Sequence, residues 1–266
     1  MWDRNILKCI KCEHVFESAP TPRPKCPKCS TTNPAWLARS ERYGMQLTDV
    51  EIASGKHRHL IGGIWEEGPY VANLLVKLGG LQPDHTVLDL GCGCLRVGIH
   101  LAQHVGAERY FGLDLNASLI KAARIEAANA GLGQLHLAVS TDFQIPEDWP
   151  EHFDFIYAGS VITHLRLHGV LQCLASISSR LGTGVFYATF LDAGDDFMSS
   201  TEQPYGVVSH FDVDPFHQNL EQLQWLASQV GLTATLVPEW STELGPPTNL
   251  ERAPMGAQKL LKIQKG

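Results

Sequence analysis

Short apolar runs alternate with longer segments of helical spacing along most of the chain. Residues 69–78 carry apolar side chains at helical spacing, and residues 86–90 form a compact apolar run that leads into a glycine-rich stretch. The same pattern predicts further helices over 97–105 and 215–230 and further strands over 109–113, 135–139, 184–190, 232–237 and 258–263. Strands that alternate with helices are typical of an α/β protein with a doubly wound sheet.

The composition fits one domain of ordinary size with a small appendage. The chain has 266 residues, of which 44% are hydrophobic and 18% charged, as is typical of a globular protein. No apolar run approaches the roughly 20 residues needed to span a bilayer. The first residues lack the basic and apolar regions of a signal peptide. We therefore expect a cytoplasmic protein without a membrane segment.

The charge is distributed unevenly. The net charge is −7, but residues 1–42 hold eight Lys and Arg against four Asp and Glu, a net charge of +4 that leaves −11 for the remainder. The acidic remainder argues against a surface built for nucleic acid. A basic head is also typical of a small solvated module, and no aromatic side chains are interleaved with its positive charges. Nucleic acid is therefore not the favoured partner.

Four of the seven cysteines form two C-x2-C pairs, Cys9 with Cys12 and Cys26 with Cys29. Two such turns that face each other place four thiolates at the corners of a tetrahedron, which Zn²⁺ accepts at about 2.3 Å per Zn–S bond. The spacing predicts a structural zinc ribbon over residues 1–33, folded by its metal. Two disulfides, a redox pair and an Fe–S site are the alternatives. The remaining cysteines lack such spacing and are expected to be reduced thiols: Cys92, Cys94 and Cys173.

The glycine-rich stretch joins a predicted strand to a predicted helix. Gly91 and Gly93 let the backbone approach a ligand closely, and Asp114 ends the next strand, where a carboxylate can accept both ribose hydroxyls of an adenosine. A dinucleotide site would carry a third glycine where Arg96 stands. Asp89 would repel a pyrophosphate but suits the ammonium group of an amino acid. This chemistry points to S-adenosylmethionine.

The run 87–93 resembles motif I of the class I S-adenosylmethionine-dependent methyltransferases, and residues 112–114 resemble the acidic end of their second strand. Residues 153–165 are similar to their fourth strand and the segment that follows it. The resemblance covers roughly residues 81–263. It implies a seven-stranded, Rossmann-like doubly wound sheet with an antiparallel last strand, and a cofactor site formed by Asp89, Gly91, Cys92, Gly93, Asp114, Leu115, Asp142, Phe143 and Ser160.

The resemblance also implies a role for several of these residues. Asp89 and Gly91 would lie near the methionine end of the cofactor, Asp114 on the ribose, Asp142 on adenine N6 and Phe143 against the adenine face. An ordinary helix N-cap is the alternative for Asp142. Residues 62–65 and 93–96 further resemble a subgroup of small-molecule and sugar-modifying enzymes.

Methyl transfer is an in-line displacement that mainly requires alignment, and it needs a base only if the acceptor is a hydroxyl or a protonated amine. His164 follows the fourth strand and is the best candidate for that base, with a solvated histidine on a helical turn as the alternative. Tyr205 and His210 fall after the fifth strand, in a segment that we expect to cover the acceptor, as does His217. The chain before the glycine turn carries side chains that would cover the cofactor: His57, Arg58 and Trp65.

Three regions result: a zinc ribbon at 1–33, a helical lead-in and cover at 34–80, and a methyltransferase domain at 81–266. We expect an enzyme that methylates a small molecule, a secondary metabolite or a sugar-bearing compound. An RNA methyltransferase that docks through the ribbon is one alternative. A non-catalytic adaptor with a degenerate cofactor fold is another, which the intact Asp89 and Asp114 disfavour.

Overall fold

The chain divides into two compact units, Met1–Met45 and Gln46–Gly266, which are described here one at a time. The computed structural model describes residues 5–8, 15–18, 25–30, 35–36, 46–59, 64–243 and 257–266.

The first unit contains a small antiparallel sheet. Its strands are β1 (Asn5–Lys8), β2 (Val15–Ser18) and β3 (Ala35–Trp36), in the order β2-β1-β3. Both β2 and β3 pair with β1 in antiparallel register. A sheet this small cannot bury enough apolar surface to fold on its own, so it needs an additional source of stability such as a metal.

The second cysteine pair of this unit lies on a turn. The Ser30 backbone N–H donates to the Cys26 carbonyl over 2.9 Å, which closes the chain around Cys29, and Cys26 is buried. Cys9 and Cys12 lie outside the described residues. Within the described ranges, no group of three or more His, Cys, Asp or Glu side chains is placed to hold a metal ion. The zinc site therefore stays a prediction.

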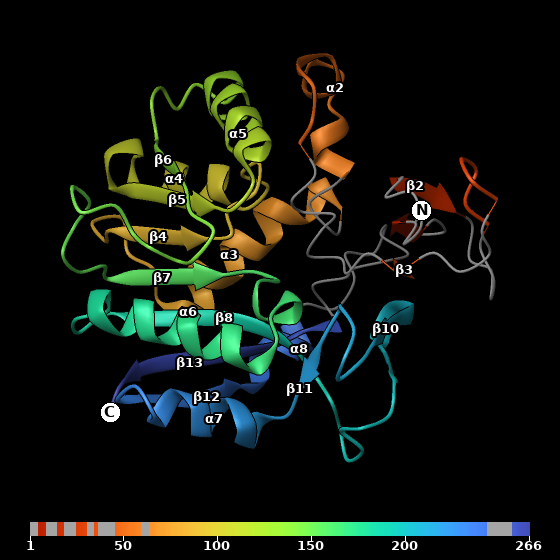
Figure 1. Cartoon of the computed structure of the whole chain (residues 1–266). Helices are drawn as coiled ribbons and strands as arrows, with labels where there is room; N and C mark the ends of the chain where they lie inside the picture. Colours follow the sequence, from red (N-terminus) through yellow and green to blue (C-terminus); the bar gives the residue numbers. More distant parts are fainter. Residues whose placement is uncertain are drawn as a thin grey trace. The chain divides into compact units, whose positions relative to one another are not determined.

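The second unit is built on a mixed sheet in the order β12-β13-β8-β7-β4-β5-β6, with β11 alongside β8 (Figure 1). The strands from β8 to β6 are parallel, whereas β13 is antiparallel to both β8 and β12. This confirms a methyltransferase-like sheet of about seven strands with an antiparallel last strand. The bounds are β4 (Val87–Leu90), β5 (Tyr110–Asp114), β6 (His136–Val139), β7 (Phe155–Ala158), β8 (Val185–Asp192), β11 (His217–Gln218), β12 (Leu232–Val237) and β13 (Lys259–Lys265).

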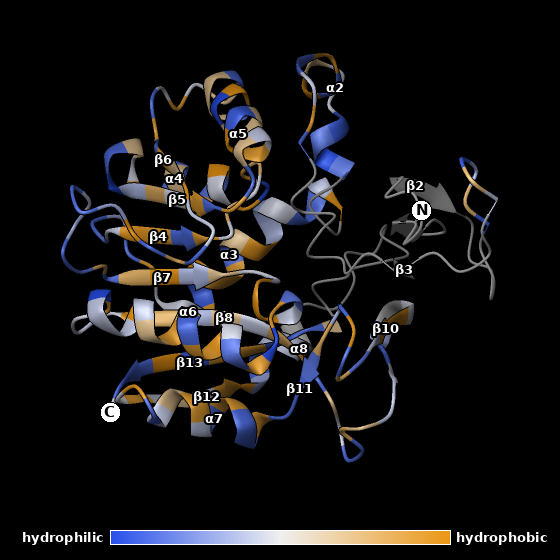
Figure 2. Cartoon of the chain, viewed as in Figure 1, coloured by the Kyte–Doolittle hydropathy of each residue, from blue (hydrophilic) through white to orange (hydrophobic). Residues whose placement is uncertain are grey.

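Helices cover both faces of this sheet, and its central strands β4 and β7 are buried along their whole length and largely hydrophobic (Figure 2). One core cluster packs α3, α4 and part of α5 against the sheet, and the other packs α6 and α7 against the opposite face. The helices are α3 (Gly68–Gly79), α4 (Gly98–Val105), α5 (Ala117–Asn129), α6 (Leu167–Arg180), α7 (Leu220–Ser228) and α8 (Pro238–Glu243). No helix of the described ranges is long and apolar enough to cross a membrane.

The chain before α3 forms short helical pieces, which we call the lead-in segment (residues 46–59 and 64–67). These are α2 (Asp49–Ala53), η1 (Lys56–His59) and η2 (Trp65–Glu67). Thr48 caps α2 in a capping box with Glu51, whose carboxylate accepts from the Thr48 backbone N–H over 2.9 Å.

The helix expected over 215–230 is shorter than its apolar pattern suggests. Residues 217–218 instead form β11, and α7 begins after Asn219, which accepts from the Gln222 backbone N–H over 3.0 Å. The competing strand pairing and the Asn219 cap therefore set the helix start. Residues 193–219 between β8 and α7, the cap segment, also hold a hairpin of β9 (Thr201–Gln203) and β10 (Val207–Ser209), joined by η5 (Pro204–Gly206).

Candidate functional site

The carboxyl ends of the parallel strands meet at one edge of the sheet, and the strand order reverses direction at β4. Strands β5 and β6 lie on one side of β4, and β7 and β8 lie on the other. Ligands of open α/β sheets bind at such a switch point, outside the carboxyl ends of the strands. We call this edge the carboxyl edge.

The glycine turn leaves β4 at the carboxyl edge. Gly91 and Gly93 have φ of +73° and +54°, which side-chain-bearing residues rarely adopt. The N–H groups of Gly91 and Cys92 both donate to the Leu113 carbonyl of β5, over 2.7 and 3.1 Å. A Cβ on Gly91 would lie 2.4 Å from Val161 Cγ2, so this turn passes against the segment after β7 and has no room for a side chain.

Asp114 ends β5 beside this turn. Its Oδ2 accepts from the Gly93 N–H over 2.8 Å and its Oδ1 accepts from the Asn116 N–H over 2.8 Å. Burial raises the pKa of this carboxyl, while the backbone N–H groups oppose that effect. Each carboxylate oxygen retains further acceptor capacity. The site therefore presents a fixed acceptor at the position expected for a ribose-binding acid.

Asp89 lies within β4, before the glycine turn, and its side chain is buried rather than exposed at the carboxyl edge. It is 3% exposed, and its Oδ2 accepts from the Tyr110 hydroxyl over 2.6 Å. Burial raises its pKa to about 7. Arg96 and Glu67, which form an ion pair at 3.6 Å, are buried as well, and their charges act on the same group of side chains. Sequence reasoning missed this polar cluster, since Glu67 lies far away in sequence and Tyr110 looks like an ordinary strand residue.

The other residues predicted to contact the cofactor lie on loops along the same edge. Leu115 is 46% exposed. Asp142 is exposed and accepts from Ser140 Oγ over 3.2 Å and from the Gln144 N–H over 3.3 Å, so it caps a turn rather than a helix. Phe143, at φ +64°, packs against the core cluster of α6 and α7.

Ser160 follows β7 and is fixed by two side chains, one from β8 and one from the residue before β13. Its backbone N–H donates to Thr189 Oγ1 over 2.7 Å, and its Oγ accepts from Gln258 Nε2 over 2.8 Å. Thr189 in turn donates to Gln258 Oε1 over 2.5 Å. The backbone at Ser160 has φ +60°. These bonds tie the end of β7 to β8 and to the start of β13.

His164 ends η4 (Ile162–His164), directly after Ser160 and Val161. Its Nδ1 lies 2.5 Å from Asp214 Oδ1 of the cap segment. The Asp214 side chain is fully buried, whereas 19% of the His164 side chain is exposed. The structure therefore brings His164 together with an acid that sequence reasoning missed, since the two residues lie 50 positions apart.

The other cap-segment candidates have different surroundings. His210 Nδ1 lies 2.7 Å from Ser200 Oγ at the surface. The backbone of Tyr205 lies in η5, and its side chain is outside the described residues. His217 is buried, with Ser209 Oγ 3.1 Å from Nδ1 and the Phe197 carbonyl 2.9 Å from Nε2. Both of its ring nitrogens are thus engaged in holding the cap segment together.

The lead-in side chains contact α5. His57 Nε2 lies 2.7 Å from Glu126 Oε1, and Arg58 donates to both Glu126 oxygens over 2.7 and 2.8 Å. The Arg58 guanidinium also lies over the Trp65 ring, 4.6 Å from its centroid. Cys94 Sγ contacts the His57 carbonyl at 3.8 Å, so the lead-in segment also reaches the glycine turn.

The three remaining cysteines are free, and all three are buried. Burial raises the pKa of Cys94 and of Cys173 to about 12, and that of Cys92 well above its usual value. Their thiols therefore stay protonated at neutral pH and are poor nucleophiles.

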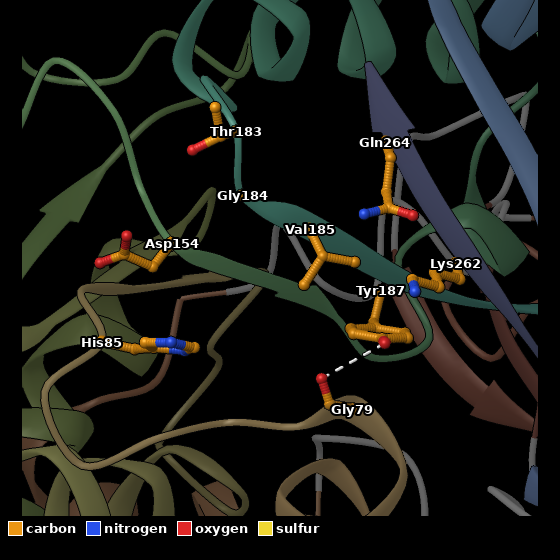
Figure 3. A pocket seen from close by; sticks show the side chains of 9 residues that line it. All are labelled: Gly79, His85, Asp154, Thr183, Gly184, Val185, Tyr187, Lys262 and Gln264. Atoms are coloured by element: carbon orange, nitrogen blue, oxygen red, sulfur yellow. Dashed lines mark hydrogen bonds between the residues drawn. The ribbon is translucent and has the colours of Figure 1, made fainter. Parts of the chain in front are cut away.

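A cavity of about 330 Å³ lies at the opposite edge of the sheet (Figure 3). Asp154 precedes β7, Val185 begins β8, and Lys262 lies on antiparallel β13. The cavity therefore opens at the amino ends of the parallel strands, away from the glycine turn, and it is separate from the predicted cofactor site.

Comparison with known proteins agrees with this geometry. Residues 87–184 match the methyltransferase domain family. A stretch of 94 residues is 33% identical to the 2-phytyl-1,4-naphtoquinone methyltransferase of Trichormus variabilis (strain ATCC 29413 / PCC 7937), and it spans 35% of this chain and 35% of that protein. The chain thus matches about a third of the length of this relative.

Solved structures share the fold at low sequence identity. The CcbJ methyltransferase of Streptomyces caelestis is 15% identical with a TM-score of 0.57, over 85% of this chain and 98% of that one. The magnesium protoporphyrin IX methyltransferase of Synechocystis PCC 6803, solved with bound S-adenosylmethionine, is 15% identical with a TM-score of 0.52, over 86% and 90%. A protein of Nostoc punctiforme PCC 73102 to which an O-methyltransferase role is ascribed is 18% identical with a TM-score of 0.55, over 81% and 60%.

Proposed function

We propose, from the class I methyltransferase domain that residues 87–184 carry, that this chain transfers a methyl group from S-adenosylmethionine to a small-molecule acceptor. The observation that carries the proposal is the bond between the Gly93 N–H and Asp114 Oδ2, which joins the glycine turn of β4 to the acid of β5 at the switch point. A secondary metabolite or a sugar-bearing compound is the acceptor class that we favour.

The residues at the carboxyl edge fit the methyl donor. The glycine turn leaves no room for a side chain at Gly91, and Asp114 offers acceptor oxygens in a fixed orientation for the ribose hydroxyls. Asp142 and Phe143 lie on the loop after β6, where they would bind the adenine. Leu115, Cys92 and Ser160, which is hydrogen-bonded to Thr189 and Gln258, would complete the site. When bound, S-adenosylmethionine supplies an activated methyl group.

Asp89 contributes from below the turn rather than by direct contact. Its carboxyl is bonded to Tyr110 and nearly inaccessible, so we propose that it fixes the end of β4 and acts on the methionine end only through its field. The ammonium group of the donor would then lie above a cluster that contains two buried acids, Asp89 and Glu67, and one buried arginine, Arg96.

Of the three predicted catalytic residues, we propose His164 as the base. It lies at the end of η4, shortly after β7, and its side chain is partly exposed. His210 is hydrogen-bonded to Ser200 on the surface of the cap segment, and we propose that His210 and Tyr205 contribute to acceptor binding rather than to proton transfer. Their segment belongs to the cap, whose residues 216–218 contact the end of η4 and β8.

Calorimetry with S-adenosylmethionine tests the proposal. We expect the native chain to bind it with micromolar affinity and Asp114→Ala to bind about 10–100 times more weakly, because a charged acceptor is lost. Asp84→Ala is the matched control, since Asp84 is an exposed acid outside the site. The proposal fails if the native chain does not bind the donor, or if both variants bind it as well as the native chain.

We further propose that the first unit is a zinc ribbon in which Cys9, Cys12, Cys26 and Cys29 hold one structural Zn²⁺. The support is the burial of Cys26, the turn that returns the chain at Cys29, and the small sheet that needs a further source of stability. Four thiolates would leave no open coordination position, so this metal would not take part in methyl transfer.

A further inference from the structure

The segment after β7, residues 160–165, contacts both halves of the proposed site. On one side, Val161 Cγ2 fills the space that a Cβ on Gly91 would need, so this segment packs against the glycine turn. On the other side, the Thr163 carbonyl accepts from the Phe216 N–H of the cap segment over 2.7 Å. The segment therefore lies between the turn proposed for the methyl donor and the residues proposed to cover the acceptor.

Ser160 begins this segment in an uncommon backbone conformation. Its φ is +60°, in the left-handed region that residues with side chains rarely adopt. A serine stays in this conformation only where the surrounding contacts hold it there. The direction in which the chain leaves β7, and with it the place of Val161, depends on those contacts.

A closed ring of three hydrogen bonds provides these contacts. Thr189 Oγ1 of β8 accepts from the Ser160 N–H over 2.7 Å and donates to Gln258 Oε1 over 2.5 Å, and Gln258 Nε2 donates to Ser160 Oγ over 2.8 Å. Both partners are buried, with Thr189 0% and Gln258 7% exposed. Because the threonine oxygen accepts from the backbone, its own proton turns toward the amide oxygen, which orients the amide nitrogen toward the serine. The ring thus holds both the backbone and the side chain of Ser160.

The backbone pairing of the sheet already joins the strands that the ring connects. β8 pairs with β7 on one side and with β13 on the other. Apolar side chains of the same shape would fill the place of the ring at little cost in stability. They would not, however, hold the N–H and the hydroxyl of Ser160 in fixed directions. The specific effect of the ring is therefore on the conformation of Ser160.

We propose that Thr189 and Gln258 are positioning residues for methyl transfer, which hold Ser160 in its left-handed conformation and so keep Val161 against the glycine turn; the proposal rests on the methyl-transfer function given above. Without the ring, Ser160 relaxes to a more common conformation and Val161 moves away from Gly91. The glycine turn then loses the side chain against which it packs, and the donor meets a less ordered site. Neither positioning residue needs to touch the donor for this effect.

Calorimetry with S-adenosylmethionine measures this effect in the full chain. Thr189→Val keeps the size of the side chain but removes both bonds of its hydroxyl, so we expect it to bind the donor about 10-fold more weakly than the native chain. Thr189→Ser keeps the hydroxyl and should retain close to the native affinity. Tyr187→Phe is the matched control, because it removes a hydroxyl of the same strand that donates to the Gly79 carbonyl at the opposite edge of the sheet. A native affinity in Thr189→Val, or an equal loss in Tyr187→Phe, overturns the proposal.

A double-mutant cycle with Ser160→Gly separates positioning from a purely structural role. Glycine adopts a φ of +60° without strain, so it depends less on the ring. We expect Thr189→Val to reduce the donor affinity by a smaller factor in the Ser160→Gly background than in the native one. A purely structural role of Thr189 would reduce the affinity by the same factor in both backgrounds, and that result would overturn the proposal.

Hydrogen exchange of the native chain gives a test that does not depend on the variants. The Ser160 amide should exchange slowly, because its N–H donates to a buried hydroxyl, and bound S-adenosylmethionine should slow it further. A Ser160 amide that exchanges as fast with the bound donor as without it contradicts the proposal, whether or not the variants fold.

The two proposals fail in different ways. If the native chain does not bind the donor in calorimetry, the methyltransferase function fails, whatever the exchange rate of the Ser160 amide. If the native chain binds the donor and Thr189→Val binds it equally well, only the positioning role of the ring fails.

Discussion

At the scale of single residues, position 91 requires glycine for two reasons, its backbone conformation and its lack of space for a Cβ, which the sequence pattern alone does not distinguish. Its φ is +73°, and a Cβ would lie 2.4 Å from Val161 Cγ2. We expect Gly91→Ala to lower the free energy of unfolding by about 2–4 kcal/mol, from both backbone strain and overpacking. Gly131→Ala, at φ +71° with open space around it, should show the backbone part alone.

Chemical denaturation measures both costs, and a second substitution separates them. Val161→Ala removes the methyl group that a Cβ at position 91 would meet, so it should reduce the added cost of Gly91→Ala toward that of Gly131→Ala. Equal costs for the two glycine variants would show that the contact with Val161 can be relieved without penalty.

Asp89 makes the stability of the chain depend on pH in a direction opposite to that of most acids. Burial raises its pKa to about 7 from 3.8, so the native state binds a proton that the unfolded state releases between these values. Its contribution to stability is therefore fully present below about pH 4 and is lost as the pH rises through 7. We expect Asp89→Asn to remove this decline, which denaturation at a series of pH values measures as a difference from the native chain. Parallel pH profiles for the two proteins would contradict it.

At the scale of elements, side chains of α5 hold the lead-in segment at more than one point. Ser118 and Lys121 bond residues 47 and 49, and Glu126 bonds η1. Glu126 is 4% exposed and bonds both His57 and Arg58. Although burial alone raises its pKa, the hydrogen bonds from Arg58 and His57 lower it overall. Glu126→Gln should therefore weaken the attachment, lower the free energy of unfolding by about 1–3 kcal/mol and make residues 46–67 more susceptible to proteolysis.

Glu151→Gln provides the control for this prediction, since the Glu151 side chain is 91% exposed. It should change neither stability nor proteolysis by a measurable amount. The pKa of Glu126 is lower in the folded chain than in the unfolded chain, so its carboxylate stabilises the fold at pH values above the unfolded pKa. This stabilisation should be lost as the pH falls below the unfolded pKa and through the lower folded pKa. A proteolysis pattern unchanged by Glu126→Gln would rule out this anchoring role.

Elements with local signals were predictable from the sequence. The strand at 232–237 and the helix before the glycine turn agree with β12 and α3 to within about a residue, because apolar periodicity and glycine ends determine them. The start of α7 was predicted wrongly, since the pairing of β11 with β8 is a long-range contact. The same reason explains why Asp114 could be proposed for the site from its position after a strand, whereas Asp214 could not: its partner lies 50 residues away.

At the scale of the whole molecule, the two units should differ in what stabilises them. The three apolar core clusters found among the described residues lie within Gln46–Gly266, so the second unit has its own source of stability. The first unit has a three-stranded sheet of short strands and depends, in our proposal, on its metal. If the proposal is right, the unit that carries the basic charge of residues 1–42 loses its fold when the metal is removed, while the second unit keeps its own.

This difference predicts separable effects of metal removal. Elemental analysis of the full chain should find one zinc per molecule, and Cys26→Ser should lose most of it, because a tetrahedral thiolate site tolerates no missing ligand. Cys173→Ala is the matched control, since Cys173 is an equally buried thiol in the second unit, and it should retain the metal. A strong chelator should leave the affinity for S-adenosylmethionine unchanged, as calorimetry would show, because Asp114 and the glycine turn lie in the unit that keeps its core. A native chain without zinc contradicts the ribbon, and a donor affinity that falls with the metal contradicts the independence of the two units.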